Sequence, residues 1–205
     1  MQKEFDYISE NYLNRVSLSL LALNRVSKDE LLSIEAFNAP LYELVYIATV
    51  GGVEEYLYHR LSKEVFENED SIQKYIDVYN NRYRKHKKKQ HIQYTPPFSA
   101  DAVEYIKETL AVYQTYHNLD VMKVYFQEIS GFNTDECPSW DKLEPIIKNR
   151  HYIVHHGARN NDGERVSIKP YDVTLAYEIA RNFIYEVEEA FVRMGKSPLI
   201  IDPRD

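Results

Sequence analysis

The sequence predicts an all-α bundle, and three observations support this prediction. Only six glycines and eight prolines occur among the 205 residues. Apolar residues recur at helical spacing along most of the chain, and no segment alternates convincingly as a β-strand would. Apolar residues also make up 44% of the sequence, which is enough to bury a core. We therefore expect helices around one long central helix.

The spacing of apolar residues predicts each helix in turn. The expected ranges are 4–25, 29–37, 40–66, 69–90, 100–117, 119–130, 140–156 and 172–195. The stretch from Leu41 to Leu61 is apolar on most sides, so the helix over 40–66 is expected to be the most buried element.

Residues with preferences for helix ends support these boundaries. Pro40 suits the first turn of the long helix. Ser99 and Asp172 suit N-caps, and Gly131 and Gly195 suit positions just after a helix.

Two helices contain residues that disfavour a helix interior. Gly51 and Gly52 together cost the long helix about 1–2 kcal/mol in propensity, so they indicate either a close contact with another helix or a kink. Pro145 either begins the regular part of the helix over 140–156 or kinks it.

The length favours a single domain over 1–205. Its core is expected over about 38–195, with a helical extension at 1–37 and an irregular tail at 196–205. The segment 157–171 is a polar connection that includes a short extended piece.

Composition bounds the cellular setting. A single cysteine, Cys137, excludes an internal disulfide framework and is expected to be a loop or packing residue. The chain has no apolar run long enough for a bilayer and no signal-peptide pattern at its start, so we expect a soluble cytoplasmic protein without a membrane partner. A net charge of −7 argues against a generic nucleic-acid coat protein but leaves room for a local basic site.

The most informative segment runs from Asn149 to Gly157 and contains an arginine and three histidines. On a helical wheel, Arg150 falls in the middle of an apolar stripe, where a charge is costly unless it is paired or used. The stripe consists of Leu143, Ile146, Ile147, Ile153 and Val154. His151 and His155 lie one turn apart on its flank, and Gly157 is expected to end the helix.

The pattern Arg150-His151-x-x-x-His155 resembles the R-x4-6-H motif of HEPN domains, in which a polar residue follows the arginine. The segment 52–57 of the long helix, which includes Glu54, resembles the glutamate-bearing core helix of several HEPN families. The polar segment 157–170 before a closing helix also resembles the family layout. At the level of pattern, the resemblance covers roughly residues 38–195.

The resemblance implies a HEPN-like helical bundle that forms a homodimer. It also implies a metal-independent endoribonuclease without a cofactor, acting as a toxin or an antiviral-defence effector, with an RNA substrate and an antitoxin protein as partners. Arg150 and His155 would be catalytic, and His151 would assist them. Glu54 would support the site, with Glu55 as the alternative if the register differs by one.

These residue types suit RNA cleavage without a metal. Histidine, with an unperturbed pKa of about 6.5, can serve as acid and as base near neutrality. Arginine supplies permanent positive charge in a fork that matches phosphate oxygens. His156 lies outside the motif and is a further supporting candidate. The expected products carry a 2′,3′-cyclic phosphate and a 5′-hydroxyl.

Three other interpretations of the motif stay open. Arg150 could pair with a buried glutamate such as Glu54 and serve folding alone. His151 and His155 also have the spacing of a metal-binding pair, although Tyr152 stands where a zincin has glutamate, and no third ligand is evident. A HEPN fold could also be a non-catalytic module that binds a protein or a nucleotide.

A basic run over 82–89 is the second candidate site. It holds six lysines and arginines and no acidic residue: Arg82, Arg84, Lys85, Lys87, Lys88 and Lys89. The run could follow RNA phosphates, with Tyr83 and Tyr94 available for stacking. Alternatively, it is a solvated helix end whose charges complement the helix dipole.

Overall fold

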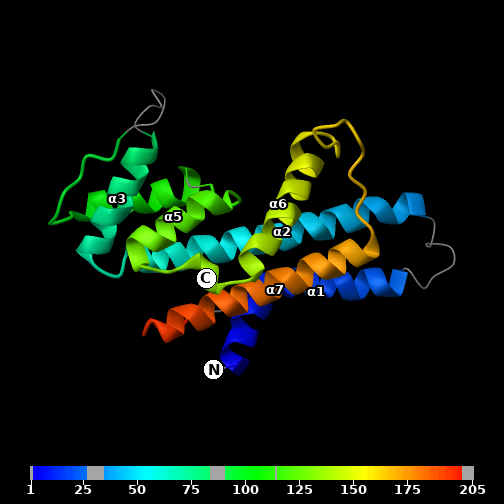
Figure 1. The fold of residues 1–205 in the computed structure, drawn as a ribbon, viewed down its shortest axis with the longest axis horizontal. Coiled ribbons are helices and arrows are strands. Elements are labelled where there is room, and N and C mark those ends of the chain that lie inside the picture. Colours follow the sequence, from blue (N-terminus) through cyan, green and yellow to red (C-terminus); the bar gives the residue numbers. More distant parts are fainter. Residues whose placement is uncertain (1, 27–34, 84–90, 114, 200–205) are drawn as a thin grey trace. The chain divides into compact units, whose positions relative to one another are not determined.

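The computed structural model of the chain describes residues 2–26, 35–83, 91–113 and 115–199 (Figure 1). In these residues helices dominate and strands are absent; only an isolated bridge pairs Arg159 with Arg165. The prediction of an all-α fold is therefore confirmed. None of the helices in this part of the chain combines the length and the apolar character that a membrane crossing requires.

The order of elements follows the expected ranges closely. The elements are α1 (Gln2–Val26), α2 (Glu35–Val65), α3 (Glu69–Tyr83), α4 (Ala100–Glu108), the π-helical turn η1 (Thr109–Tyr113), α5 (Leu119–Ser130), the 3-10 turn η2 (Thr134–Glu136), α6 (Ser139–His155) and α7 (Pro170–Arg193). Residues 35–37 of the short helix expected over 29–37 belong to α2, and the rest of that range lies outside the described residues.

Two predicted helix starts are wrong. Pro40 lies inside α2, which already begins at Glu35. Asp172 is not the N-cap of α7, because the helix begins at Pro170. Instead, the Asp172 carboxylate accepts a hydrogen bond of 2.9 Å from the backbone N–H of Lys169, so it closes the first turn from within the helix.

The chain forms two compact units. Unit 1 comprises Met1–Tyr56 and Asp135–Asp205, and unit 2 comprises Leu57–Thr134. Unit 1 contains α1, the first part of α2, α6 and α7. The expectation of a single domain over the whole chain stays a prediction.

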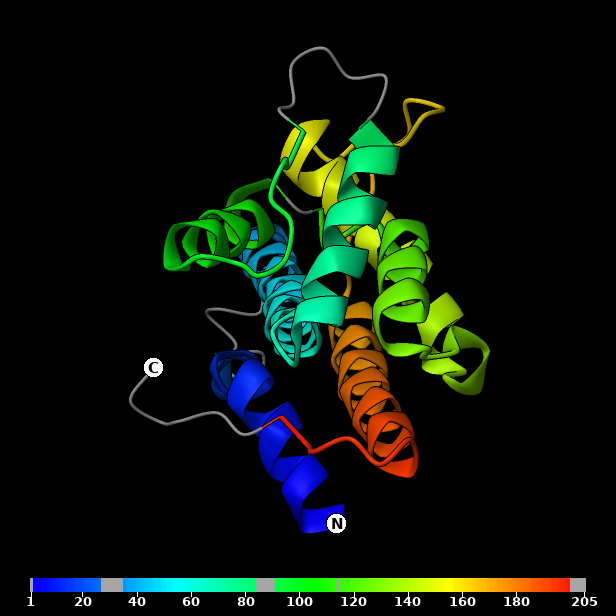
Figure 2. The same ribbon diagram turned by 90° about the vertical axis from the view of Figure 1, so that its left-hand side faces the viewer.

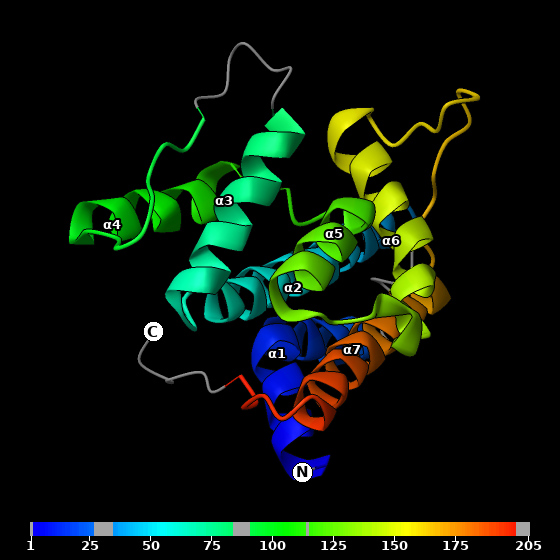
Figure 3. The same cartoon turned by 60° about the vertical axis from the view of Figure 1, so that its left-hand side comes forward.

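In unit 1, α1 and α7 run side by side in opposite directions (Figures 1 and 3). Aromatic side chains join the helices of this unit. Phe5 of α1 meets Tyr185 of α7 edge to face at 5.3 Å between ring centroids, and Trp140 of α6 lies 5.2 Å from Phe183 of α7. Such pairs contribute about 0.5–1.5 kcal/mol each beyond the area they bury. The packing of α6 against α7 in this core fixes where the motif segment begins.

The start of α6 is held by a carboxylate from α7. The N-cap residue Pro138 makes no side-chain cap, but Glu186 accepts hydrogen bonds of 2.8 Å from both the backbone N–H and the hydroxyl of Ser139. A carboxylate at this end also complements the helix dipole. Cys137 is buried beside it, and burial raises the pKa of its thiol to about 12. Pro145 lies inside α6, which continues to His155.

In unit 2, α3 and α5 pack side by side (Figure 2). Tyrosine rings fill the space between them. Tyr75 lies 5.5 Å from Tyr125 and 6.1 Å from Tyr79, measured between ring centroids. The Asn80 side chain exchanges two hydrogen bonds with the backbone of Ile92, at 2.8 and 2.9 Å, and so anchors the chain where it returns to α3.

The paired glycines of α2 mark a close helix contact. A Cβ atom placed on Gly52 would lie 2.6 Å from the backbone oxygen of Tyr12 in α1, whereas one placed on Gly51 would meet nothing within 4 Å. Of the two alternatives that the sequence left open, the structure supports close approach for Gly52. Only one of the two glycines is therefore required by packing.

The two glycines yield a matched pair of variants. We expect Gly52→Ala to lower the free energy of unfolding by about 1–3 kcal/mol, because backbone must move to admit the methyl group. Gly51→Ala should raise it by up to about 1 kcal/mol through helix propensity. Denaturant unfolding of both variants tests this, and equal effects of the two substitutions would contradict the assigned contact.

Candidate functional site

The motif segment is held against α2 by two neighbouring residues of α6. Asn149 interacts with the hydroxyl of Tyr46, and Arg150 forms an ion pair with Glu54. Tyr46 is buried, and burial raises the pKa of its hydroxyl to about 12, although the interaction with Asn149 opposes the rise. All four residues belong to unit 1.

The ion pair of Arg150 is loose for a largely buried arginine. The Nη2 atom of Arg150 lies 3.7 Å from Oε2 of Glu54, which is beyond hydrogen-bond distance, and their side chains are 19% and 21% exposed. The Nε atom of Arg150 is buried and has no hydrogen-bond partner among the described residues. The guanidinium of Arg150 is thus held by electrostatic attraction to Glu54, while its Nε–H group makes no hydrogen bond to the described residues.

The structure distinguishes between the two candidate glutamates. Glu54 pairs with Arg150. Glu55 is exposed, and its charge acts on Tyr12 of α1, where it adds to the rise in the pKa of that hydroxyl that burial causes. Of the two glutamates, Glu54 is therefore the one that contacts the motif arginine.

The apolar stripe around Arg150 is buried on one side of it only. Leu143, Ile146 and Ile147 are buried, whereas Val154 is 44% exposed. Figure 1 shows that the C-terminal half of α6 (yellow) stands away from α7. Arg150 therefore lies where the helix passes from the core of unit 1 to its surface, rather than in the middle of a buried face.

The three histidines gather on the exposed end of α6. The ring centroid of His151 lies 4.9 Å from that of His155 and 5.0 Å from that of His156. The Nε2 atoms of His151 and His156 are 3.2 Å apart and share a hydrogen bond. The structure thus brings together the two motif histidines and His156, whose contact with His151 was not predicted.

A sharp turn places His156 against His151. The backbone N–H of His156 still bonds to Tyr152, and the next two residues, Gly157 and Ala158, have φ values of 59° and 58°. Gly157 ends the helix as expected. Ala158 is a rarer occupant of this left-handed region, which costs a residue with a Cβ about 1–2 kcal/mol. Buried Ala158 also accepts a 2.8 Å bond from Val166, which ties the turn to the following loop.

The structure describes only the first two residues of the basic run, Arg82 and Tyr83. Arg82 lies in the last turn of α3, with its Cζ atom 5.2 Å from the ring centroid of Tyr83 and its Nη2 atom 3.4 Å from the hydroxyl oxygen of Thr115. Arg84, Lys85, Lys87, Lys88 and Lys89 lie outside the described residues. An RNA-binding role for the run stays a prediction.

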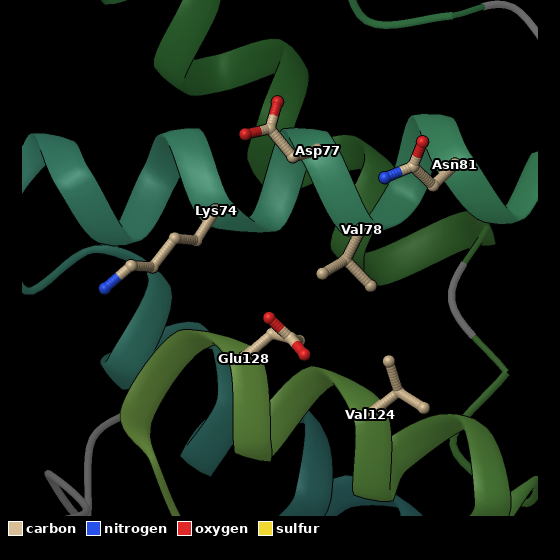
Figure 4. Close-up of a pocket in the computed structure, with 6 residues that line it drawn as sticks. All are labelled: Lys74, Asp77, Val78, Asn81, Val124 and Glu128. Carbon is tan, nitrogen blue, oxygen red and sulfur yellow. The ribbon is translucent and has the colours of Figure 1, made fainter.

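A groove of about 350 Å³ lies between α3 and α5 in unit 2 (Figure 4). Two valines form part of its wall, and the other lining side chains are polar or charged. The lining residues are Lys74, Asp77, Val78, Asn81, Val124 and Glu128. Lys74 is already paired with Asp70 at 2.7 Å. None of the residues predicted from the motif contributes to this groove.

Sequence reasoning missed two contributors to the site. Asn149 precedes the motif arginine, and Tyr46 lies two turns before Glu54 in α2. A polar residue directly before a half-buried arginine is a weak signal, because most such residues face solvent. The sequence alone does not distinguish Tyr46 from the other tyrosines of the chain, because its burial and its contact with Asn149 are known only from the structure.

Comparisons with protein-family models, curated proteins and solved structures found no match for this chain. In the described part of the chain, no group of three His, Cys, Asp or Glu side chains is arranged to hold a metal ion. The features of the chain that bear on function are therefore the arginine, the glutamate and the three histidines.

Glutamate neighbours in α2 allow the ion pair to be tested. We expect Glu54→Gln to lower the free energy of unfolding by about 1–3 kcal/mol, because it leaves the partly buried charge of Arg150 without a counter-ion. The control, Glu55→Gln, alters an exposed position and should change stability by less than about 0.5 kcal/mol. Denaturant unfolding at low salt measures both, and equal values would contradict a stabilising role of the pair.

Proposed function

We propose that this protein is a metal-independent endoribonuclease of HEPN type that acts as a homodimer. The observation that carries the proposal is the state of Arg150. Its charge is held in place by Glu54, yet the buried Nε has no hydrogen-bond partner among the described residues and the ion pair is too long for a hydrogen bond. A phosphate group could use these donors once movement of the side chain makes Nε accessible, because arginine recognises phosphate through a fork of N–H groups.

The histidines supply groups for proton transfer from the same helix as this cation. In the proposed reaction, one imidazole removes the proton of a 2′-hydroxyl, the 2′-oxygen attacks the adjacent phosphorus, and another imidazole protonates the departing 5′-oxygen. The products are a 2′,3′-cyclic phosphate and a 5′-hydroxyl. His155 is our candidate for one of these roles. His151 would orient the site or share the proton transfer, and its bond to His156 gives the latter a supporting role.

A dimer would complete the site. On the helical wheel Arg150 and His155 are about 140° apart, which is poor geometry for an acid, a base and a phosphate clamp within one chain. Two chains would contribute two arginines and two sets of histidines to one substrate. A toxin or antiviral-defence role, with an antitoxin as partner, extends this proposal from the resemblance of the motif.

The ion pair also favours a second candidate, a non-catalytic HEPN module. Arg150 has a carboxylate partner and is mostly buried, which is what a purely structural arginine requires. This alternative predicts the same fold and no RNA cleavage. The two candidates therefore differ in one activity measurement.

RNA cleavage by the purified full chain in EDTA tests the proposed reaction. We expect the wild type to cleave, Arg150→Ala to be slower by at least about 10²-fold, and His155→Ala to be slower by about 10²–10⁴-fold. Arg165→Ala removes an exposed arginine outside the motif and is the control for general loss of positive charge. Absence of cleavage by the wild type would favour the non-catalytic module, and cleavage by Arg150→Ala at the wild-type rate would overturn the assigned role.

Dimerisation has a separate consequence for kinetics. If the site is composite, cleavage per chain should fall when the protein is diluted below the dissociation constant of the dimer. Light scattering establishes that constant, and the same samples are used for the cleavage assay. Specific activity that stays constant across the dissociation range would contradict a site shared by two chains.

A further inference from the structure

The pair His151 and His156 forms a feature that the proposed reaction does not fully use. Their Nε2 atoms lie 3.2 Å apart on the exposed end of α6, and both side chains are exposed to solvent. We propose that this pair binds a divalent transition-metal ion such as Zn²⁺, Cu²⁺ or Ni²⁺, and that the bound ion inhibits the site.

The separation of the two nitrogens matches that of neighbouring ligands on such an ion. Zinc binds imidazole nitrogen at about 2.0–2.1 Å. Two nitrogens at that distance from one ion and 3.2 Å from each other subtend an angle of about 100° at the ion, near the tetrahedral value. The ion would lie little more than 1 Å from the line between the nitrogens, so small rotations of the rings would suffice.

Binding requires only a change of tautomer in one ring. In this pair, the Nε2 atom that carries the proton donates the hydrogen bond, and the other Nε2 atom accepts the bond. When both rings are neutral, the donor ring moves its proton from Nε2 to Nδ1, and both Nε2 lone pairs then coordinate the ion. No oxidant, reductant or further group takes part in this step.

The donor set predicts which ions bind. Imidazole favours zinc, copper and nickel, whereas magnesium and calcium favour oxygen ligands. Since no third histidine, cysteine or carboxylate completes a site in the described part of the chain, water would fill the other positions. The i, i+4 spacing of His151 and His155 suggested a metal pair, whereas the proposed site rests on the 3.2 Å separation of the Nε2 atoms of His151 and His156.

Isothermal titration of the full chain with Zn²⁺ tests the site without any assay of activity. One ion per chain is expected for the wild type. His151→Ala and His156→Ala should each weaken binding by at least about tenfold, because each removes one of two ligands. His155→Ala is the matched control, since it removes an exposed imidazole from the same turn and should leave affinity within about threefold. Circular dichroism confirms that each variant is folded.

Unchanged affinity for Zn²⁺ in His156→Ala would overturn the metal site, and so would an equal loss of affinity in His155→Ala. Binding of Mg²⁺ as tightly as Zn²⁺ would also contradict it, because it would indicate attraction to charge rather than coordination by imidazole.

The inhibition rests on the proposed function, whereas the binding does not. If the protein cleaves RNA, Zn²⁺ at concentrations that fill the site should suppress cleavage, and EDTA should restore it. Zinc that binds without suppressing cleavage would overturn the inhibitory role. Zinc that binds to a protein without any ribonuclease activity would leave the site in place and refute the proposed function alone.

Discussion

The interaction on which the site depends is the junction of α2 and α6 at Glu54 and Arg150. The side chain of Arg150 is about four-fifths buried, so its charge needs a counter-ion. Glu54 of α2 is that counter-ion. The ion pair, at 3.7 Å, holds the charge without saturating its hydrogen-bond donors. Since Asn149 contacts Tyr46 beside it, two successive residues fix the rotation of α6 about its axis. That rotation determines which side chains the last turn of the helix presents to solvent.

Contacts at both ends of α6 hold the helix in place, so the side chains at its exposed end have defined positions. Glu186 binds the first turn of the helix, and the left-handed Gly157 and Ala158 turn the chain back at the other end. The permanent charge is therefore partly buried and positioned, whereas the histidines beyond it face solvent. This arrangement suits a site in which a fixed cation binds a phosphate while the groups that exchange protons stay accessible to solvent. It suits a surface metal site for the same reason.

Much of the fold followed from the sequence because helical periodicity and core burial agree along most of the chain. The helix ends were less predictable, since Pro40 tolerates an interior position and Asp172 caps from within the first turn. Periodicity also placed Arg150 among apolar residues, but it could not show that Val154 of the same stripe is exposed. The contact between His151 and His156 depends on the turn at Gly157 and Ala158, which follows the helix. A helical wheel describes only residues within a helix and cannot predict such a turn.

In our proposal, Arg150 binds a phosphate group of RNA and does not serve folding alone. The double variant Glu54→Gln/Arg150→Met removes both charges while keeping the side chains similar in size, so stability should return close to that of the wild type. The most direct measurement is the rate of RNA cleavage in EDTA by this folded double variant. Our account predicts a loss of at least about 10²-fold despite restored stability. Cleavage at the wild-type rate would show that the arginine serves the fold only.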